Sequence, residues 1–156
     1  MCFQKRTFPG LCGDFLHQNL VASDVYAARA YKSGNYTVIE MILNPQTDGA
    51  NGNMYSGSVG HAISVVGDID EVIGQFSGLG MDAVIADENV RLDYTNPRLK
   101  VLVDGNGMIV NGTWSYVVNI SLKQLQIKAM GLTVDVAQAD AIVDFVVVLN
   151  GGFKEA

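Results

Sequence analysis

The stretch from residue 99 to residue 110 constrains the fold of this chain most, because it has the pattern of two short strands joined by a tight turn. Residues 99–103 are mainly apolar, residues 104–107 are Asp-Gly-Asn-Gly, and residues 108–110 are apolar again. Asp-Gly and Asn-Gly tolerate the positive φ angles that tight hairpin turns require. We therefore predict a β-hairpin here, and with it a fold that contains antiparallel sheet.

The residues that follow predict a longer strand. A second turn is predicted at residues 111–112, which are Asn-Gly. Beyond it, Trp114, Tyr116 and Val118 occupy every second position of residues 113–122. Because successive side chains of a strand point to opposite faces, this alternation indicates a strand with one face firmly buried.

Several other short apolar runs are separated by turn-forming residues, at 37–43, 61–66, 72–77, 83–86 and 145–149. Short strands at this spacing are typical of a small sandwich or barrel. Residues 24–31 are predicted to form a short helix with Asp24 as a possible N-cap. Residues 123–130 could extend the sheet, while the spacing of residues 134–142 admits either a strand or a short helix. We expect an all-β class with room for one or two short helices.

The chain is predicted to be a single β-rich domain, residues 10–156, preceded by an extended N-terminal arm, residues 1–9. The arm has no clear hydrophobic period and ends in the turn signal Pro9-Gly10. Residues 46–60 are rich in Gly, Asn and Ser, which predicts a long loop. Loops of this length inside a compact domain are often functional.

The composition indicates a protein that binds other protein chains. Apolar residues make up 49% of the sequence and charged residues only 17%, against about 25% charged in typical domains. Large apolar patches left on a surface usually mark contacts, so we expect a homo-oligomer or a permanent partner. The net charge of −6 argues against nucleic-acid binding. The apolar run at residues 141–149 is too short to cross a bilayer, so no membrane association is expected.

The sequence offers little for catalysis, and we expect no enzyme activity. His17 and His61 are its only histidines, which leaves few candidates for acid–base chemistry near neutral pH. Ser58 lies in a segment that resembles a nucleophile turn but lacks the glycine two residues earlier. No phosphate-binding glycine pattern is present in usable form, so no cofactor is expected.

Metal binding is not predicted either. The acidic residues cluster in two groups, but neither has the spacing of a calcium loop: Asp68, Asp70 and Glu71, and Asp82, Asp87 and Glu88. Cys2 and Cys12 are expected to be free thiols, because no secretory segment follows Met1. Two cysteines without Cys-x-x-Cys spacing give no support for a zinc site.

The N-terminal region resembles the opening of the small cement, or decoration, proteins of tailed-phage capsids. The resemblance rests on residues 8–15, Phe-Pro-Gly-Leu-Cys-Gly-Asp-Phe, followed by Asn19 and by Val-Ala-Ser at 21–23. Leu20 stands where those openings usually have proline. Residues 73–76 and the strand at 114–118 look loosely like later strands of that family. The convincing part covers about a tenth of the chain.

The resemblance implies a β-rich, non-enzymatic, commonly trimeric protein on the outer surface of a bacteriophage capsid, synthesised in the host cytoplasm. Its partner would be the major capsid protein, or other virion subunits. The alternatives are a tail-tube, head-completion or minor coat protein and, from another class, a small ligand-binding or enzymatic barrel. We expect the arm and the glycine-rich loop to make the contacts, through Phe3, Lys5, Arg6, Phe8, Asn51, Asn53, Met54 and Tyr55.

Overall fold

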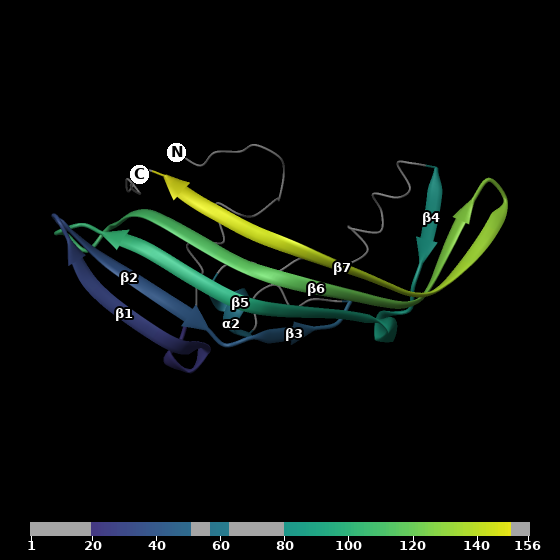
Figure 1. Ribbon diagram of the computed structural model, residues 1–156, viewed down its shortest axis with the longest axis horizontal. Coiled ribbons are helices and arrows are strands. Elements are labelled where there is room, and N and C mark those ends of the chain that lie inside the picture. Colours follow the sequence, from purple (N-terminus) through teal and green to yellow (C-terminus); the bar gives the residue numbers. More distant parts are fainter. Residues whose placement is uncertain (1–19, 51–56, 63–79, 151–156) are drawn as a thin grey trace.

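The computed structural model describes residues 20–50, 57–62 and 80–150, and these residues form one open antiparallel sheet (Figure 1). The sheet order is β1-β2-β5-β6-β4, with β3 pairing with β5 and β7 pairing with β6. The all-β prediction is confirmed, and the sheet is not closed into a barrel. The strands are β1 (Val25–Ser33), β2 (Tyr36–Leu43), β3 (Gln46–Asp48), β4 (Met81–Val84), β5 (Val90–Val103), β6 (Ile109–Ala129) and β7 (Leu132–Asn150).

The two longest strands, β6 and β7, form one hairpin that runs the length of the sheet. They contain 21 and 19 residues, so each spans roughly 60–70 Å at about 3.3 Å per residue. A two-residue turn joins them, with positive φ at Met130 (51°) and Gly131 (79°), as a type I′ hairpin requires. Residues 123–130 therefore extend the sheet mainly through β6, and residues 134–142 are strand rather than helix.

The end of this hairpin bends toward β4, at the right of Figure 1. Within β6, Gln124 has a φ of 53° and is skipped in the otherwise regular pairing with β7. At this point β6 stops pairing with β5, at Leu122, and starts pairing with β4, at Gln126. We call the part of the hairpin beyond Gln124 the distal hairpin.

The predicted hairpin at residues 99–110 is confirmed. β5 ends at Val103 and β6 begins at Ile109. Between them a carboxylate oxygen of Asp104 accepts hydrogen bonds from the backbone N–H groups of Asn106 and Met108, both at 2.9 Å. The alternation beyond it is also confirmed, since Trp114, Tyr116 and Val118 are all buried.

The second predicted turn, at Asn111-Gly112, is wrong, because both residues lie inside β6. A Cβ atom at residue 112 would lie 2.6 Å from two ring atoms of Trp114 and 3.3 Å from a methyl group of Val101. The glycine therefore makes room for the indole ring in the core. Its conformational freedom is not needed for a turn.

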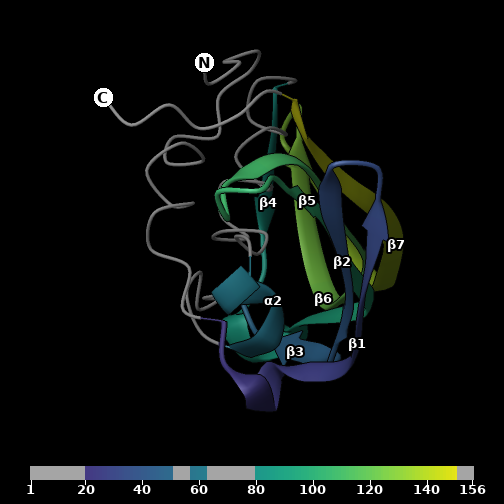
Figure 2. The same ribbon diagram turned by 90° about the vertical axis from the view of Figure 1, so that its left-hand side faces the viewer.

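The core lies on one face of the sheet, around the rings of Tyr94, Tyr116 and Phe145. The ring of Tyr116 meets Tyr94 edge-on at 5.3 Å between centroids and stacks on Phe145 at 4.8 Å. Burial raises the pKa of the Tyr116 hydroxyl. The short helix α2 (Gly57–Ala62) lies on one side of the sheet (Figure 2) and adds Val59 and Ala62 to the same cluster.

Further predictions about local structure need correction. The helix expected at residues 24–31 is wrong, because this segment contains the end of the 3-10 turn η2 (Ala22–Asp24) and then β1. Pairing with β2 along the whole of β1 outweighs a weak helix preference.

The loop expected at residues 46–60 contains β3 and most of α2 in its described parts. Residues 61–62 of the strand expected at 61–66 lie in α2, and residues 63–66 lie outside the described residues. The strand expected at 83–86 is confirmed at residues 83–84, since β4 ends at Val84, before the turn η3 (Asp87–Asn89). The N-terminal arm at 1–9 and the run at 72–77 lie outside the described residues.

Candidate functional site

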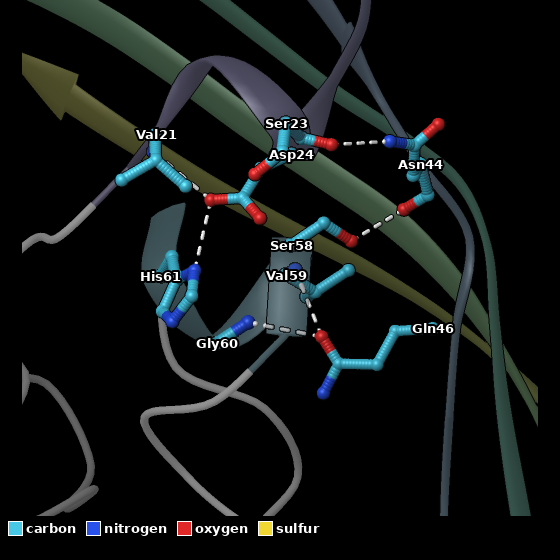
Figure 3. Close-up of polar contacts among 9 residues, drawn as sticks. All are labelled: Val21, Ser23, Asp24, Asn44, Gln46, Ser58, Val59, Gly60 and His61. Carbon is cyan, nitrogen blue, oxygen red and sulfur yellow. Dashed lines mark hydrogen bonds and ion pairs between the residues drawn. The ribbon is translucent and has the colours of Figure 1, made fainter.

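The most enzyme-like arrangement is an aspartate–histidine pair beside a serine (Figure 3). His61 Nδ1 lies 2.8 Å from a carboxylate oxygen of Asp24, which also accepts the backbone N–H of Val21 at 3.0 Å. Burial alone would raise the pKa of Asp24, but the contacts with Val21 and His61 outweigh it and lower the pKa. Asp24 is therefore held as a carboxylate between η2 and α2.

The serine does not complete a catalytic triad with this pair. Ser58 Oγ donates to the backbone carbonyl of Asn44 at 2.5 Å, and Figure 3 shows it directed away from His61. A triad needs the serine hydroxyl on the free imidazole nitrogen. These contacts instead attach α2 to the start of the sheet.

Gln46 strengthens that attachment from the other side of α2. Its side-chain carbonyl accepts the backbone N–H groups of Val59 at 2.9 Å and Gly60 at 3.3 Å. Its amide donates to Asp48 at 2.8 Å, although burial still raises the pKa of Asp48. The arrangement satisfies helix N–H groups that have no partner within so short a helix.

A shallow groove of about 630 Å³ lies on the face of the sheet opposite the aromatic core, across β1, β2, β5 and β6. Glu40 occupies its middle and forms ion pairs with Arg29 and with Lys100, the latter at 3.2 Å. Hydrogen bonds first from Arg29 and then from Lys100 hold the pKa of Glu40 below its usual range. Arg29 and Lys100 are thus engaged by a carboxylate of the same chain, and the third cation that lines the groove, Arg98, donates to the side-chain oxygen of Asn96 at 2.8 Å. The groove is therefore a poor candidate for an anion-binding pocket.

The described residues hold no group of three or more histidine, cysteine, aspartate or glutamate side chains placed to bind a metal ion. Asp82 lies in β4, while Asp87 and Glu88 lie in η3. The other acidic group, at residues 68–71, lies outside the described part, as do His17 and both cysteines. Among the described helices, none is long and apolar enough to cross a membrane.

The strongest candidate for a functional surface is the outer edge of β7. Among the described strands, β7 pairs only with β6, so its other edge faces away from the sheet. Its exposed large apolar side chains are Leu132, Val134, Ile142, Val143, Val146 and Val148. An exposed edge of this length, with apolar side chains beside it, is a template for pairing with another chain.

The opposite edge of the sheet, β1, has a different character. Among the described strands it pairs only with β2, and all of its residues after Val25 are exposed. It carries Arg29 and Lys32 and no acidic residue, whereas β7 carries Asp135, Asp140 and Asp144 and no basic residue. The sheet therefore has one basic edge and one acidic edge.

The contact residues predicted from the sequence are not tested by the described part of the structure. All eight lie outside the described residues, so they stay predictions: Phe3, Lys5, Arg6, Phe8, Asn51, Asn53, Met54 and Tyr55. Sequence reasoning did not identify the β7 edge. A signal was available in the apolar residues at the even positions 142, 146 and 148, which cannot lie on the same face as Phe145 in a single strand.

Comparison with protein families, curated proteins and solved structures finds no match for this chain.

Proposed function

We propose that this chain is a structural subunit that works by binding other protein chains, and specifically a cement protein of a tailed-phage capsid. The observation that carries the proposal is the exposed outer edge of β7, with apolar side chains along most of its length. Ile142 is 74% exposed and Val146 60% exposed. Side chains of this kind are usually covered in the working state of a protein.

The rest of the chain agrees with such a role. The low charged fraction of 17% gives little electrostatic protection against association. Within the described residues, the pair that looks most catalytic, Asp24 and His61, attaches α2 to η2. A cement protein that binds only the assembled, expanded shell stabilises that state by mass action, and needs no chemistry of its own.

Co-sedimentation with purified phage heads tests the proposal. The chain is expected to pellet with expanded heads, to saturate at a fixed copy number and to raise the temperature at which the heads lose their contents. Unexpanded heads are the matched control and are expected to bind less. Absence of binding to expanded heads at tens of micromolar would overturn the cement role. Rings or tubes formed by the chain alone, without head binding, would favour a different virion subunit.

A deletion variant tests the contribution of the N-terminal arm to binding separately from that of the sheet. Deleting residues 1–7 is expected to leave the circular dichroism spectrum and unfolding midpoint unchanged, because all the described strands are formed by later residues. Head binding is expected to weaken, since the predicted contacts Phe3, Lys5 and Arg6 are removed. Unchanged head binding would remove the arm from the proposed interface.

A further inference from the structure

We propose that the acidic β7 edge of one copy binds the basic β1 edge of the next copy, so that the sheet continues from subunit to subunit. This inference rests on the proposed role as an assembling subunit and names a partner, which is a second copy of the chain. It does not depend on which shell the assembly binds.

The first support is that each of the two outermost strands, β1 and β7, has one edge that pairs with no described strand. The path runs from β1 through β2 and β5 to β6, and β7 lies beyond β6 along most of its length. Each of these steps is antiparallel. Unpaired N–H and C=O groups along such edges readily pair with another strand.

The second support is charge, which distinguishes between the possible pairings. Two β7 edges would bring together Asp135, Asp140 and Asp144 from each copy without a basic residue between them. A β7 edge facing β1 instead meets Arg29 and Lys32 without an acidic residue. Like charges facing each other across strands are destabilising and opposite charges are favourable. The pairing of unlike edges is therefore favoured.

The third support is that the side chains concerned share one face of the sheet. Arg29 lies opposite Glu40, Glu40 opposite Lys100, Lys100 opposite Thr113, and Thr113 opposite Val148. Since side chains alternate along a strand, the even positions of β7 from 142 to 148 point to the same face as Arg29. If the sheet continues into a second copy with this face on the same side, Arg29 of one copy lies beside these β7 residues of the other.

The strand order also fixes the direction of the new pair. Four antiparallel steps separate β1 from β7, so the two strands run in the same direction within one copy. When a second copy is placed edge to edge with the same face of its sheet on the same side, its strands run in the same directions as those of the first copy. Its β1 therefore runs parallel to β7 of the first copy. A contact between unlike edges closes into a ring or extends as a filament.

Asp144 is the favoured partner of Arg29. Asp140 already accepts hydrogen bonds from Ser121 and Gln138, each at 2.7 Å. Within the described part of the chain Asp144 has no such partner, and the Arg29 side chain is 72% exposed despite its ion pair with Glu40. With Arg29 beside Asp144, Ala27 lies near Ile142 and Tyr31 lies near Val146, so apolar groups flank the ion pair.

Charge reversal tests the contact on the full chain. Arg29→Asp and Asp144→Arg are each expected to weaken self-association by about tenfold or more, measured by sedimentation velocity, because each places like charges together. An equimolar mixture of the two variants is expected to recover association, since each acidic edge then meets a basic one. Arg91→Asp is the matched control: it reverses an equally exposed arginine on β5, away from both edges, and is expected to leave association unchanged.

The outcomes separate this inference from the proposed function. A wild-type chain that stays monomeric at tens of micromolar, or variants that associate like wild type, would overturn the edge contact even if heads are still bound. Association that responds to Asp144→Arg but not to Arg29→Asp would point to two β7 edges and also overturn it. Recovery in the mixture without any binding to heads would support the edge contact and leave the cement role rejected.

Discussion

The two parts of β6 have the same strand geometry but different surroundings. From Ile109 to Leu122 the strand lies between β5 and β7, and its even-numbered side chains form the middle of the core. Beyond Gln124 it pairs with the short β4 and with the start of β7, where Leu132 is 71% exposed and Met130 99% exposed. We infer that the first part supplies the stability of the fold, while the distal hairpin and the β7 edge present surface.

The largest expected effect comes from removing an aromatic ring of the core. Tyr94→Ala is expected to lower the free energy of unfolding by about 3–5 kcal/mol, because the fully buried ring packs edge-on against Tyr116. Leu132→Ala in the distal hairpin is the control and is expected to change it by less than about 0.5 kcal/mol. Urea denaturation measures both. Equal effects would mean that the distal hairpin contributes as much to stability as the aromatic core.

A glycine inside the first part of β6 gives the next effect. Gly112→Ala is expected to cost about 1–3 kcal/mol, because its methyl group would lie 2.6 Å from the Trp114 ring within a filled core. Gly105→Ala is the matched control, since nothing lies within 4 Å of a Cβ there, and should leave the unfolding midpoint nearly unchanged. A neutral Gly112→Ala variant would show that the core around Trp114 can readjust.

Gly112 also shows where prediction from the sequence succeeds and fails. The turn at Asp104 and the alternation of Trp114, Tyr116 and Val118 depend on neighbouring residues, so the hairpin and the buried face could be predicted. The length of β6 could not be predicted. Asn-Gly is a turn signal in any sequence, including one in which the glycine only makes room for an indole ring. That need for room arises only from packing.

Pro97 illustrates the same limit. Asn-Pro is a turn signal, yet Asn96 and Pro97 both lie inside β5, at a shift in its register with β6. This shift lies between residues 92–94 of β5, which pair with β3, and residues 98–103, which pair with β2. A proline at this position removes no ladder hydrogen bond to either strand. The candidate edges were missed for a related reason: which strand lies at an edge is set by the sheet order, which no local pattern encodes.

The aspartate that attaches α2 to η2 gives a smaller, pH-dependent effect. Asp24→Asn is expected to cost about 1 kcal/mol at neutral pH, because the charged contact with His61 is lost. The pKa of Asp24 is lowered in the folded chain, so its contribution is present above the ordinary value of 3.8 and is lost as the pH falls through the lower folded value. The wild-type chain should therefore lose more stability than the variant between pH 5 and about pH 2.

Asp93→Asn is the matched control for this pH dependence. The pKa of Asp93 is also lowered, by Arg91 and then by Thr47, but its ion pair with Arg91 is more exposed to solvent. Solvent screens such pairs, so a smaller loss is expected. Unfolding midpoints measured from pH 7 to pH 2 compare the two variants. A larger effect for Asp93 would mean that the attachment of α2 contributes little to the fold.

The smallest expected effect lies at the tip of the distal hairpin and tests whether this region opens separately from the core. Gly131 has a φ of 79° and no atom within 4 Å of a Cβ position, so Gly131→Ala adds only the strain of a left-handed backbone, about 1 kcal/mol. Met130→Asn, at a φ of 51°, should act in the opposite direction, because asparagine tolerates this conformation better than methionine. If the distal hairpin frays independently, residues 125–136 should exchange hydrogen faster than residues 114–120 in the wild-type chain, and Gly131→Ala should speed exchange in residues 125–136 while lowering the free energy of unfolding measured with urea by no more than the added strain. Equal exchange of the two segments in the wild-type chain would mean that β6 opens as one unit and that its two parts do not differ in stability.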